Sequence, residues 1–353
     1  MSRQKVILSK DFAKDLQEAI NTQSYDKLFV LTDEQTHEFC QPSIQNILDE
    51  LEAQSITIGS TDLNKNLDSL AKVWAELGAN GASRQSLLIN LGGGMITDLG
   101  GFAASTFKRG IKYINVPTTL LSMVDASVGG KTGINFNGLK NEVGVFNPAS
   151  VVIIETDFLR TLNRQNLLSG YGEMIKHGLI SNQKHWAELL QFDFENPEYD
   201  HLKQMVGVSV AVKEDIVEKD PFEQNIRKAL NFGHTVGHAF ESLSFIEDRP
   251  VLHGYAVAWG MVCELYMSAV NVGFPQDKLR QTVAYIKENY GSFPIDCKKY
   301  DQLYDLMKHD KKNVGGVINF TLLKDIGDIQ INQTASKESI FEMFDFYREC
   351  MGL

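Results

Sequence analysis

Short apolar segments alternate with amphipathic stretches over about the first 150 residues, and this alternation restricts the fold more than any other feature. Brief apolar runs bounded by polar residues are typical of buried strands. The stretches between them carry helical periodicity, as with Leu67, Leu70, Val73 and Leu77. Strands that alternate with helices favour a parallel sheet covered on both faces. The expected strands are residues 5–8, 27–32, 55–58, 86–91, 112–116 and 150–155.

The pattern changes after about residue 160, where one helix-length stretch follows another and only residues 316–323 resemble a strand. We therefore expect an α/β protein with an N-terminal Rossmann-like parallel-sheet domain in residues 1–160 and a mostly α-helical domain in residues 161–353. A sheet of this kind binds ligands beyond the carboxyl ends of its strands. The expected helices of the second domain are residues 165–180, 200–219, 234–243, 253–272, 275–290 and 300–307.

Composition and charge exclude several classes of function. The chain has 45 acidic and 34 basic residues and a formal net charge of −11, which argues against nucleic acid as a partner. No apolar window reaches the ~18 residues that a membrane span needs, and the first residues lack a signal-peptide core. Four widely spaced cysteines, without a C-x-x-C pair, predict neither a disulfide framework nor a thiolate zinc cluster. We expect a cytoplasmic protein with a small-molecule partner and no membrane partner.

A glycine-rich segment, Leu88–Phe102, runs from an expected strand into an expected helix. Backbone N–H groups at such a helix start bind phosphate readily. The dinucleotide fingerprint G-x-G-x-x-G is incomplete, because Thr97 stands at the third glycine position after Gly92 and Gly94. The segment is therefore interpreted either as a phosphate-binding turn or as a tight turn that needs glycine for positive φ.

A second polar, glycine-rich segment contains Asp125, Lys131, Lys140 and Asn141. Its Gly-Lys-Thr sequence resembles the end of a nucleotide-triphosphate loop, but Asp125 replaces the first glycine that this motif requires, so the match fails. Two interpretations remain at this point, a solvated surface loop and a loop that binds an anionic ligand.

Three histidines lie within a short region of the helical half. His234 and His238 are four residues apart and share a helix face, and His253 opens the next helical stretch. The zincin motif is absent because Thr235 follows His234. A single histidine on an apolar helix is usually a core or capping residue, but three histidines within 20 residues, two of them directly preceded by a glycine, favour a metal site.

Glu173 and Lys176 are three residues apart in an apolar helical pattern, so the pair is expected to be partly buried. Such a pair is either a weak surface ion pair or, when buried near histidines, a metal-ligating carboxylate beside a cation that binds substrate. Further basic residues that could serve an anionic ligand are Arg109, Lys213, Arg227, Lys311 and Lys312.

Taken together, several strings resemble the 3-dehydroquinate synthase family in order and spacing. They are GGGMITDLGGFAASTFKRG, NVPTTLLSMVDASVGGKTGIN, GLKN, SGYGEMIKHG, RKALNFGHTVGHAFE and LHGYAVAWGM. The resemblance is strong over residues 86–263 and weaker toward both ends. Two departures are small: Gly170-Tyr171-Gly172 replaces the usual Gly-Met-Ala, and Asp62 stands where glutamate is common.

The resemblance implies a carbon–oxygen lyase of the shikimate pathway, which leads to chorismate and the aromatic amino acids. The family converts 3-deoxy-D-arabino-heptulosonate 7-phosphate, a phosphorylated sugar acid, into 3-dehydroquinate and phosphate. Its reaction uses transient oxidation by NAD, phosphate elimination, re-reduction and an intramolecular aldol closure. The alternatives are another sugar-phosphate cyclase, of the 2-epi-5-epi-valiolone or 2-deoxy-scyllo-inosose synthase type, and then a metal-dependent polyol dehydrogenase.

The resemblance also implies site residues, a homodimer and two cofactors, NAD and a divalent metal (zinc or cobalt). The metal ligands would be Glu173, His234 and His253. Binding of NAD would involve Asp33, Asp62, Lys65, Gly92, Gly93, Gly94, Asp98, Thr118, Thr119, Lys140, Phe158 and Thr161. Substrate would be bound by Arg109 across the dimer interface and by Asp125, Lys131, Asn141, Lys176, Lys213, Arg227, Asn231, His238 and one of Lys311 or Lys312. The catalytic residues would be His238, Glu223 and Lys131.

Overall fold

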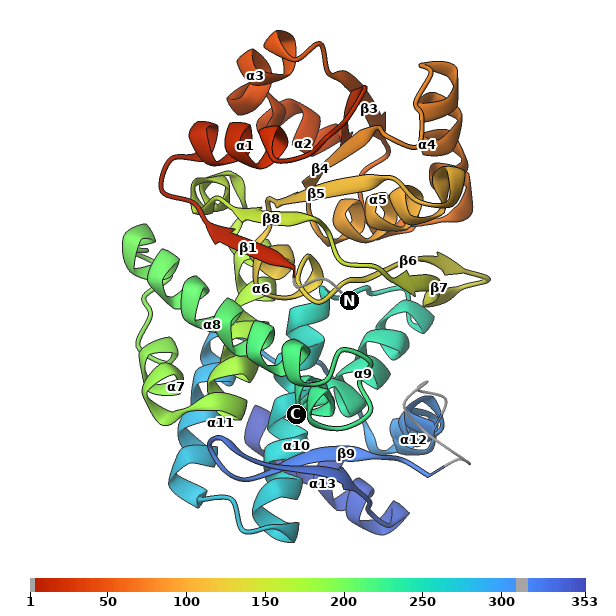
Figure 1. The fold of residues 1–353 in the computed structure, drawn as a ribbon. Coiled ribbons are helices and arrows are strands. Elements are labelled where there is room, and N and C mark those ends of the chain that lie inside the picture. The colour runs from red at the N-terminus through yellow and green to blue at the C-terminus, as the bar shows by residue number, and fades with distance from the viewer. Residues whose placement is uncertain (1–3, 309–316) are drawn as a thin grey trace. The chain divides into compact units, whose positions relative to one another are not determined.

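A computed structural model describes residues 4–308 and 317–353, and the chain divides into two compact units, Met1–Asn163 and Arg164–Leu353. The first contains a six-stranded sheet in which all neighbouring strands are parallel, in the order β1-β8-β5-β4-β2-β3 (Figure 1). Its strands are β1 (Lys5–Leu8), β2 (Leu28–Asp33), β3 (Gln54–Ile58), β4 (Leu87–Gly92), β5 (Lys112–Pro117) and β8 (Val151–Ile154).

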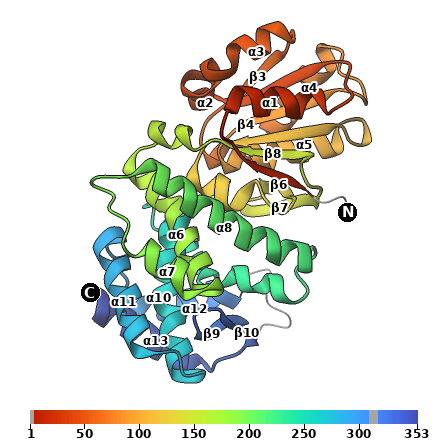
Figure 2. The same ribbon diagram turned by 60° about the vertical axis from the view of Figure 1, so that its left-hand side comes forward.

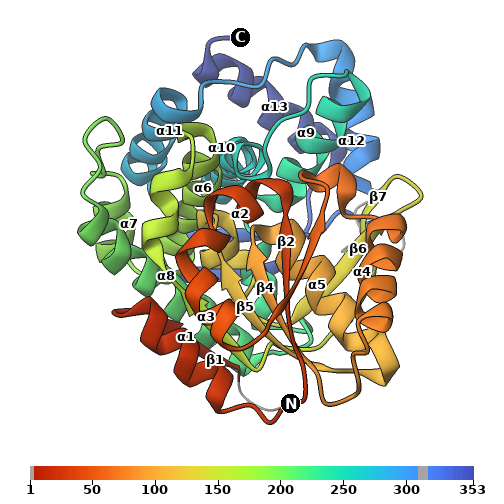
Figure 3. The ribbon, with the colours of Figure 1, turned by 90° about the horizontal axis from the view of Figure 1, so that it is seen from above.

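Helices cover both faces of this sheet, as the alternating pattern predicts. In Figure 3, α1 (Phe12–Asn21) and α3 (Gln45–Glu50) lie on one side, and α4 (Leu67–Ala79) and α5 (Gly94–Thr106) lie on the other. Every residue of β2 and β4 is buried as a result. The chain passes from β2 outward to β3, and from β4 outward in the opposite direction through β5 to β8. The carboxyl ends of β2 and β4 are therefore the switch point at which such sheets bind ligands.

The segment after residue 130 is not the loop that its glycines and polar residues suggest. It forms an antiparallel hairpin of β6 (Lys131–Phe136) and β7 (Leu139–Phe146). Gly130, with a φ of +71°, makes the turn into β6, and at Gly144 a Cβ would lie 2.1 Å from the carbonyl oxygen of Thr132. Glycine thus permits close strand pairing here, a use that its ordinary association with loops conceals.

The second unit is mostly helical, with α10 (His253–Asn271) at its centre. Helices α6 (Arg164–Ser181), α9 (His234–Ile246), α11 (Gln276–Tyr290) and α13 (Lys337–Met351) contact α10. Helices α7 (Gln183–Leu189) and α8 (Tyr199–Lys219) lie against α6 (Figure 2). The remaining elements include α12 (Tyr300–Lys308), which contacts α9, and the antiparallel strands β9 (Phe320–Asp325) and β10 (Asp328–Gln333).

Close approach of the helices explains one glycine of the second unit. A Cβ on Gly254 would lie 1.7 Å from the carbonyl oxygen of Ser169, so only glycine lets the start of α10 approach α6 this closely. The hydroxyl of Ser169 also accepts a hydrogen bond of 3.1 Å from the Gly254 N–H. These contacts set the position of the residue that opens α10, His253.

The elements expected from the sequence agree with the structure to within a few residues, with one larger shift. The strand expected at residues 316–323 begins at Phe320 and ends at Asp325, because it pairs with β10, which the sequence pattern did not reveal. Residue 316 itself lies outside the described residues. Over residues 4–308 and 317–353, no helix combines the length and apolar character that crossing a bilayer requires.

A buried histidine between α7 and α8 predicts an acid-sensitive packing contact. His185 is 1% exposed, its Nε2 lies 2.9 Å from Ser209 Oγ, and burial lowers its pKa to about 4. Because an unfolded histidine titrates near ~6.5, this contact stabilises the fold fully above pH ~6.5 and loses its effect as the pH falls toward 4.

The expected loss on acidification is about 3 kcal/mol at most, from the difference between these two pKa values. His185→Gln should make the free energy of unfolding fall less steeply between pH 6.5 and 4, as measured by urea denaturation. His201→Gln, at a partly exposed position on α8, is the control. Equal pH dependence in wild type and His185→Gln would contradict the prediction.

Candidate functional site

The glycine-rich turn lies at the switch point of the sheet. Gly92 ends β4, and Gly93 is the N-cap of α5 without a side-chain hydrogen bond to the first helical N–H groups. These donors can bind an anion. The alternative of a turn that needs positive φ is wrong, because none of the three glycines has one and Gly93 has a φ of −71°. Close packing explains the glycine instead: a Cβ on Gly93 would lie 3.1 Å from Thr119 Cγ2.

Several predicted NAD-binding residues meet near the same ends of the strands. The Cys40 thiol lies among Asp33, Thr118 and Thr161: burial and the Asp33 carboxylate raise its pKa to about 11, while hydrogen bonds with the two threonine hydroxyls oppose the rise. The threonines follow β5 and β8, so residues far apart in the sequence are brought together here. Phe158, from the 3₁₀ turn after β8, is buried.

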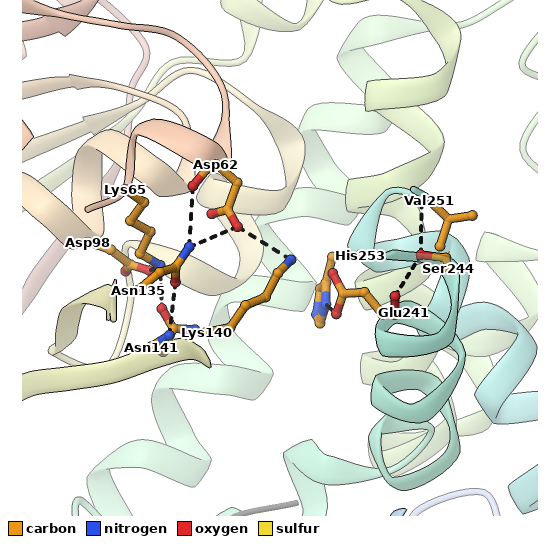
Figure 4. Close-up of polar contacts among 10 residues, drawn as sticks. All are labelled: Asp62, Lys65, Asp98, Asn135, Lys140, Asn141, Glu241, Ser244, Val251 and His253. Carbon is orange, nitrogen blue, oxygen red and sulfur yellow. Dashed lines mark hydrogen bonds and ion pairs between the residues drawn. The ribbon is translucent and has the colours of Figure 1, made fainter. Parts of the chain in front are cut away.

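A second polar cluster links the start of α5 to the β6–β7 hairpin. The ammonium group of Lys65, which is only 4% exposed, donates hydrogen bonds to Asp98 of α5 and to Asn141 of β7 (Figure 4). A buried ammonium needs such partners, because an unpaired charge in the interior is costly. Lys65 therefore connects two residues that the family resemblance assigns to different ligands, NAD and substrate.

The hairpin is held to the Asp62–Lys65 segment by further contacts. Asp62 Oδ2 lies 3.4 Å from Lys140 Nζ. Asn135 Nδ2 donates to the same Asp62 oxygen at 3.2 Å, and Asn135 Oδ1 accepts from the Asn141 N–H at 2.9 Å. Asn135 lies within the GKTGIN string but was not assigned a role from the sequence. Asn135 of β6 contacts both Asn141 of β7 and Asp62. The sequence does not show these contacts, because they depend on how β6 pairs with β7.

The first unit does not bring every predicted residue to this edge. Arg109 follows α5, a helix of 13 residues and thus about 20 Å long, so it lies at the opposite end of the sheet from Gly93. It has a φ of +72°, in the left-handed region that is uncommon for residues other than glycine. Asp125 and Lys131, by contrast, lie on elements that contact α5: Asp125 in the π-helical turn Ser122–Ala126, and Lys131, which is exposed, at the start of β6.

The second unit brings a buried carboxylate and two imidazoles together. Glu173 Oε1 lies 3.3 Å from His234 Nε2 and 3.4 Å from His253 Nε2, and over residues 4–308 and 317–353 no other group donates a hydrogen bond to it. Ligands that surround zinc tetrahedrally at about 2.0–2.2 Å are themselves roughly 3.3–3.6 Å apart. The spacing of these atoms therefore fits a divalent metal bound by one carboxylate and two imidazoles.

The outer nitrogens of both imidazoles are engaged in a way that leaves Nε2 for a metal. His234 Nδ1 lies 3.1 Å from the Phe232 carbonyl oxygen, and His253 Nδ1 lies 3.3 Å from Glu241 Oε2. Such bonds fix the tautomer in which Nδ1 carries the proton and Nε2 presents its lone pair. Glu241 was not assigned from the sequence, although it follows His234 and His238 on one helix face, at a spacing of i, i+4 and i+7.

Charge at this centre is closely balanced. Glu173 and Lys176 are fully buried and form an ion pair. Burial opposes ionisation of Glu173, but Lys176 and His234 hold the pKa of its carboxyl well below the usual range. Burial likewise opposes protonation of His253, yet Glu241 and Glu173 raise its pKa to about 10. Proton binding and metal binding at this centre are therefore linked, because an imidazole must be neutral to ligate a metal.

A third imidazole offers a second possible set of ligands. The ring of His238 lies 5.3 Å from that of His234 and 5.9 Å from that of His253, measured between centroids. The ligand atoms of these three histidines lie within 4.8 Å of one another. The geometry therefore accommodates a metal bound by three histidines as well as one bound by Glu173 and two histidines, and the two sets can be tested separately.

A loop between α8 and α9 holds the predicted anion-binding residues. Asp220 accepts hydrogen bonds from the N–H groups of Gln224, Asn225 and Arg227, at 3.0, 2.6 and 3.1 Å. Arg227 is buried within this loop. The sequence did not single out Asp220, because a carboxylate that accepts hydrogen bonds from backbone N–H groups has no characteristic spacing.

Two further contacts complete this region. Asn231 Nδ2 donates to Glu223 Oε1 at 2.7 Å, which joins the ends of the loop. Lys213 is buried on α8, which contacts both α6 and the 3₁₀ turn Ile226–Asn231. Lys311 and Lys312 lie outside the described residues. The structure thus positions Lys213, Arg227 and Asn231 on elements that contact one another.

Glu264 is another carboxylate that the sequence analysis missed. It is fully buried on α10 and accepts hydrogen bonds from the N–H groups of Gly233, at 2.7 Å, and Val236, at 3.1 Å. It therefore caps the start of α9 and holds His234 in place. Its signal in the sequence is a single acidic residue within an otherwise apolar helix.

Comparison with known proteins identifies related sequences over the whole chain. Residues 55–169 match the family model described as 3-dehydroquinate synthase N-terminal, and residues 170–313 match that described as 3-dehydroquinate synthase C-terminal. The chain is 59% identical to the 3-dehydroquinate synthase of Parabacteroides distasonis, over 100% of both chains. It is 40% identical to that of Oceanobacillus iheyensis, over 86% of this chain and 84% of the relative.

Solved structures share the fold at low sequence identity. A 2-deoxy-scyllo-inosose synthase complexed with carbaglucose-6-phosphate, NAD⁺ and Co²⁺ has a TM-score of 0.84 at 22% identity, covering 98% of this chain and 96% of that one. The 2-epi-5-epi-valiolone synthase of Streptomyces hygroscopicus, with NAD⁺ and Zn²⁺ bound, has a TM-score of 0.85 at 22% identity and covers 99% and 98%. A butanol dehydrogenase of Thermotoga maritima has a TM-score of 0.66 at 13% identity and covers 98% and 97%.

Proposed function

Because the chain belongs to the 3-dehydroquinate synthase family, we propose that it converts 3-deoxy-D-arabino-heptulosonate 7-phosphate into 3-dehydroquinate and phosphate. The observation that carries this function is 59% identity over the whole length to a 3-dehydroquinate synthase. The enzyme is a carbon–oxygen lyase of the shikimate pathway, the route to chorismate and the aromatic amino acids. The buried centre of Glu173, His234 and His253 supports the same assignment.

The proposed cofactors are NAD and a divalent metal. NAD supplies a reversible acceptor for hydride, so that it is regenerated in each turnover, and the metal, zinc or cobalt, polarises substrate hydroxyls. We assign NAD to the carboxyl edge of the sheet in the first unit, where the open N–H groups after Gly93 suit its phosphates. The other residues assigned to it are Asp33, Asp62, Lys65, Gly92, Gly94, Asp98, Thr118, Thr119, Lys140, Phe158 and Thr161.

The metal is assigned to Glu173, His234 and His253. Their donor atoms, one carboxylate oxygen and two imidazole nitrogens, are the set that leaves coordination positions open for a substrate. Lys176 neutralises the remaining charge of the Glu173 carboxylate and keeps its second oxygen occupied. The first oxygen of Glu173 is thereby directed to the two histidines.

Cationic and polar side chains are proposed to hold the substrate, which carries a carboxylate and a phosphate. Guanidinium and ammonium groups bind such anions through charge-assisted hydrogen bonds. Burial of Lys213 and Arg227 strengthens these bonds, because water screens them less. The residues assigned to substrate are Arg109, Asp125, Lys131, Asn141, Lys176, Lys213, Arg227, Asn231 and one of Lys311 or Lys312.

His238, Glu223 and Lys131 are proposed to hold or move protons. His238 lies on the α9 face that carries His234, so its ring is held beside the metal ligands without being required as one. Glu223 accepts a hydrogen bond from Asn231, which orients its carboxylate. Side chains held in this way can deliver a proton without first reorganising.

We further propose that the enzyme works as a cytoplasmic homodimer. The position of Arg109, at the end of the sheet opposite to Gly93, supports a role toward the site of a second copy rather than its own. Its left-handed backbone conformation supports a functional constraint at that point. Acidic composition and the lack of membrane-spanning helices in the described part of the chain are compatible with this location.

Lys65→Met should weaken NAD binding roughly 10- to 150-fold, since hydrogen bonds to charged groups contribute about 1.5–3 kcal/mol. The substitution removes the cation that orients Asp98 and Asn141. The dissociation constant of NADH, from its fluorescence on binding, measures the effect. Lys72→Met is a matched control, because Lys72 is exposed in the same unit and bonds only the Thr57 carbonyl among the contacts described. Equal affinity in all three proteins would contradict the assignment.

The function itself is tested by phosphate release from 3-deoxy-D-arabino-heptulosonate 7-phosphate. Chelator-treated protein receives NAD and zinc singly and together while NADH absorbance is followed. Phosphate release only with both, without net NADH, is the expected result. Release from sedoheptulose 7-phosphate or glucose 6-phosphate instead would indicate another cyclase. Net NADH from an alcohol, without phosphate release, would indicate a polyol dehydrogenase.

A further inference from the structure

Glu241 is a buried carboxylate of α9 that faces a residue of the metal centre but is not itself among the proposed ligands. It is 5% exposed, and its Oε2 lies 3.3 Å from His253 Nδ1 (Figure 4). We propose that Glu241 is a positioning residue that holds His253 in the tautomer and orientation that present Nε2 to a divalent metal. The inference rests on the proposed function only insofar as that function requires a metal at Glu173, His234 and His253.

The two imidazoles of the centre need different support. The His234 side chain is 10% exposed and its Nδ1 contacts a backbone carbonyl, so local backbone structure orients this ring. His253 is the first residue of α10 and its side chain is 26% exposed. A partly exposed ring at a helix start can rotate unless a specific bond holds it. Among the described contacts of His253, the bond to Glu241 meets this need.

Neighbouring contacts hold Glu241 and His253 at this separation. The hydroxyl of Ser244, one turn after Glu241, donates to the Glu241 carbonyl oxygen at 2.6 Å and accepts from the Val251 N–H at 3.3 Å. Ser244 therefore joins α9 to the segment that leads into His253 (Figure 4). On the other side, the Gly254 N–H bonds Ser169 of α6. The backbone around His253 is thus anchored to two helices, while Glu241 anchors the side chain.

The charge of Glu241 has a second effect on the metal. A carboxylate that accepts the Nδ1 proton of a ligating imidazole increases the basicity of Nε2, and loss of such an outer partner typically lowers metal affinity 10- to 100-fold. The Nδ1 of His234 instead contacts a neutral backbone carbonyl, that of Phe232. We therefore expect His253 to depend on its partner more strongly than His234 does.

The test compares metal affinity in Glu241→Gln, Glu241→Ala and wild type without substrate or NAD, by zinc competition with a chromophoric chelator. Glu241→Gln keeps the size and an acceptor oxygen but removes the charge, so its affinity should fall about 10-fold. Glu241→Ala removes both and should approach a 100-fold loss. Glu247→Gln is the matched control, because Glu247 makes only ion pairs with Arg249 and Lys299 among the contacts described.

The visible spectrum of the cobalt-substituted protein provides a second measurement. Altered d–d bands in Glu241→Gln, with unchanged bands in Glu247→Gln, would indicate a changed orientation of His253. Wild-type zinc affinity and cobalt spectrum in Glu241→Gln would overturn the proposal, whatever Glu241→Ala does to folding. Failure of the proposed function is a separate result, because it appears as absent phosphate release while these metal measurements stand by themselves.

Discussion

His253→Ala should lose both bound zinc and turnover while the protein remains folded. The substitution removes one imidazole of the metal centre, and the side chain is partly exposed at a helix start, so little packing is lost. A bound metal contributes several kcal/mol to such reactions, so turnover should fall on the order of a thousandfold or more. Metal content after dialysis, circular dichroism and phosphate release measure the three quantities.

His238→Ala separates the two possible ligand sets. If Glu173, His234 and His253 bind the metal, His238→Ala keeps the zinc and loses turnover, because His238 then serves only in binding substrate and moving a proton. Loss of zinc in His238→Ala would favour the set of three histidines instead. Undiminished activity of His253→Ala in metal-free buffer would contradict a metal centre at this position.

Arg227→Ala should raise the KM for the phosphorylated substrate roughly 10- to 150-fold and leave the affinity for NAD nearly unchanged. The expected size follows from about 1.5–3 kcal/mol for a charge-assisted hydrogen bond. Arg227 is buried in a loop whose backbone Asp220 holds, and its guanidinium donates to the Pro221 carbonyl oxygen at 2.5 Å, so this group is positioned in advance. Steady-state kinetics with each ligand varied in turn provides the measurement.

Arg227→Lys is the informative companion of this variant. It keeps the positive charge but loses the planar fork that binds a carboxylate through two parallel hydrogen bonds. Its KM should therefore lie between those of wild type and Arg227→Ala. Equal losses of affinity for substrate and NAD in Arg227→Ala would mean that the loop, rather than the guanidinium, had been disturbed.

Local sequence patterns account for most elements of the fold. The strand β4 and the helix α8 are examples, because their buried side chains form an apolar run in β4 and recur at helical spacing in α8. Such patterns of apolar residues can be recognised in the sequence. The hairpin of β6 and β7 was missed because its glycines serve close strand pairing rather than a turn. β10 was missed because its side chains are mostly exposed or half-buried, so they carry no apolar pattern.

The residue types of the site and the family of the chain can be predicted without coordinates, since motif spacing lies within the chain. The partners of those residues follow instead from the packing of helices and strands. Three contacts between separate elements illustrate this. They are the bond of Glu241 to His253, the bond of the Arg227 N–H to Asp220, and the bonds of Lys65 to Asp98 and Asn141. Such contacts depend on how helices and strands pack, and packing leaves no regular spacing in the sequence from which a partner can be derived.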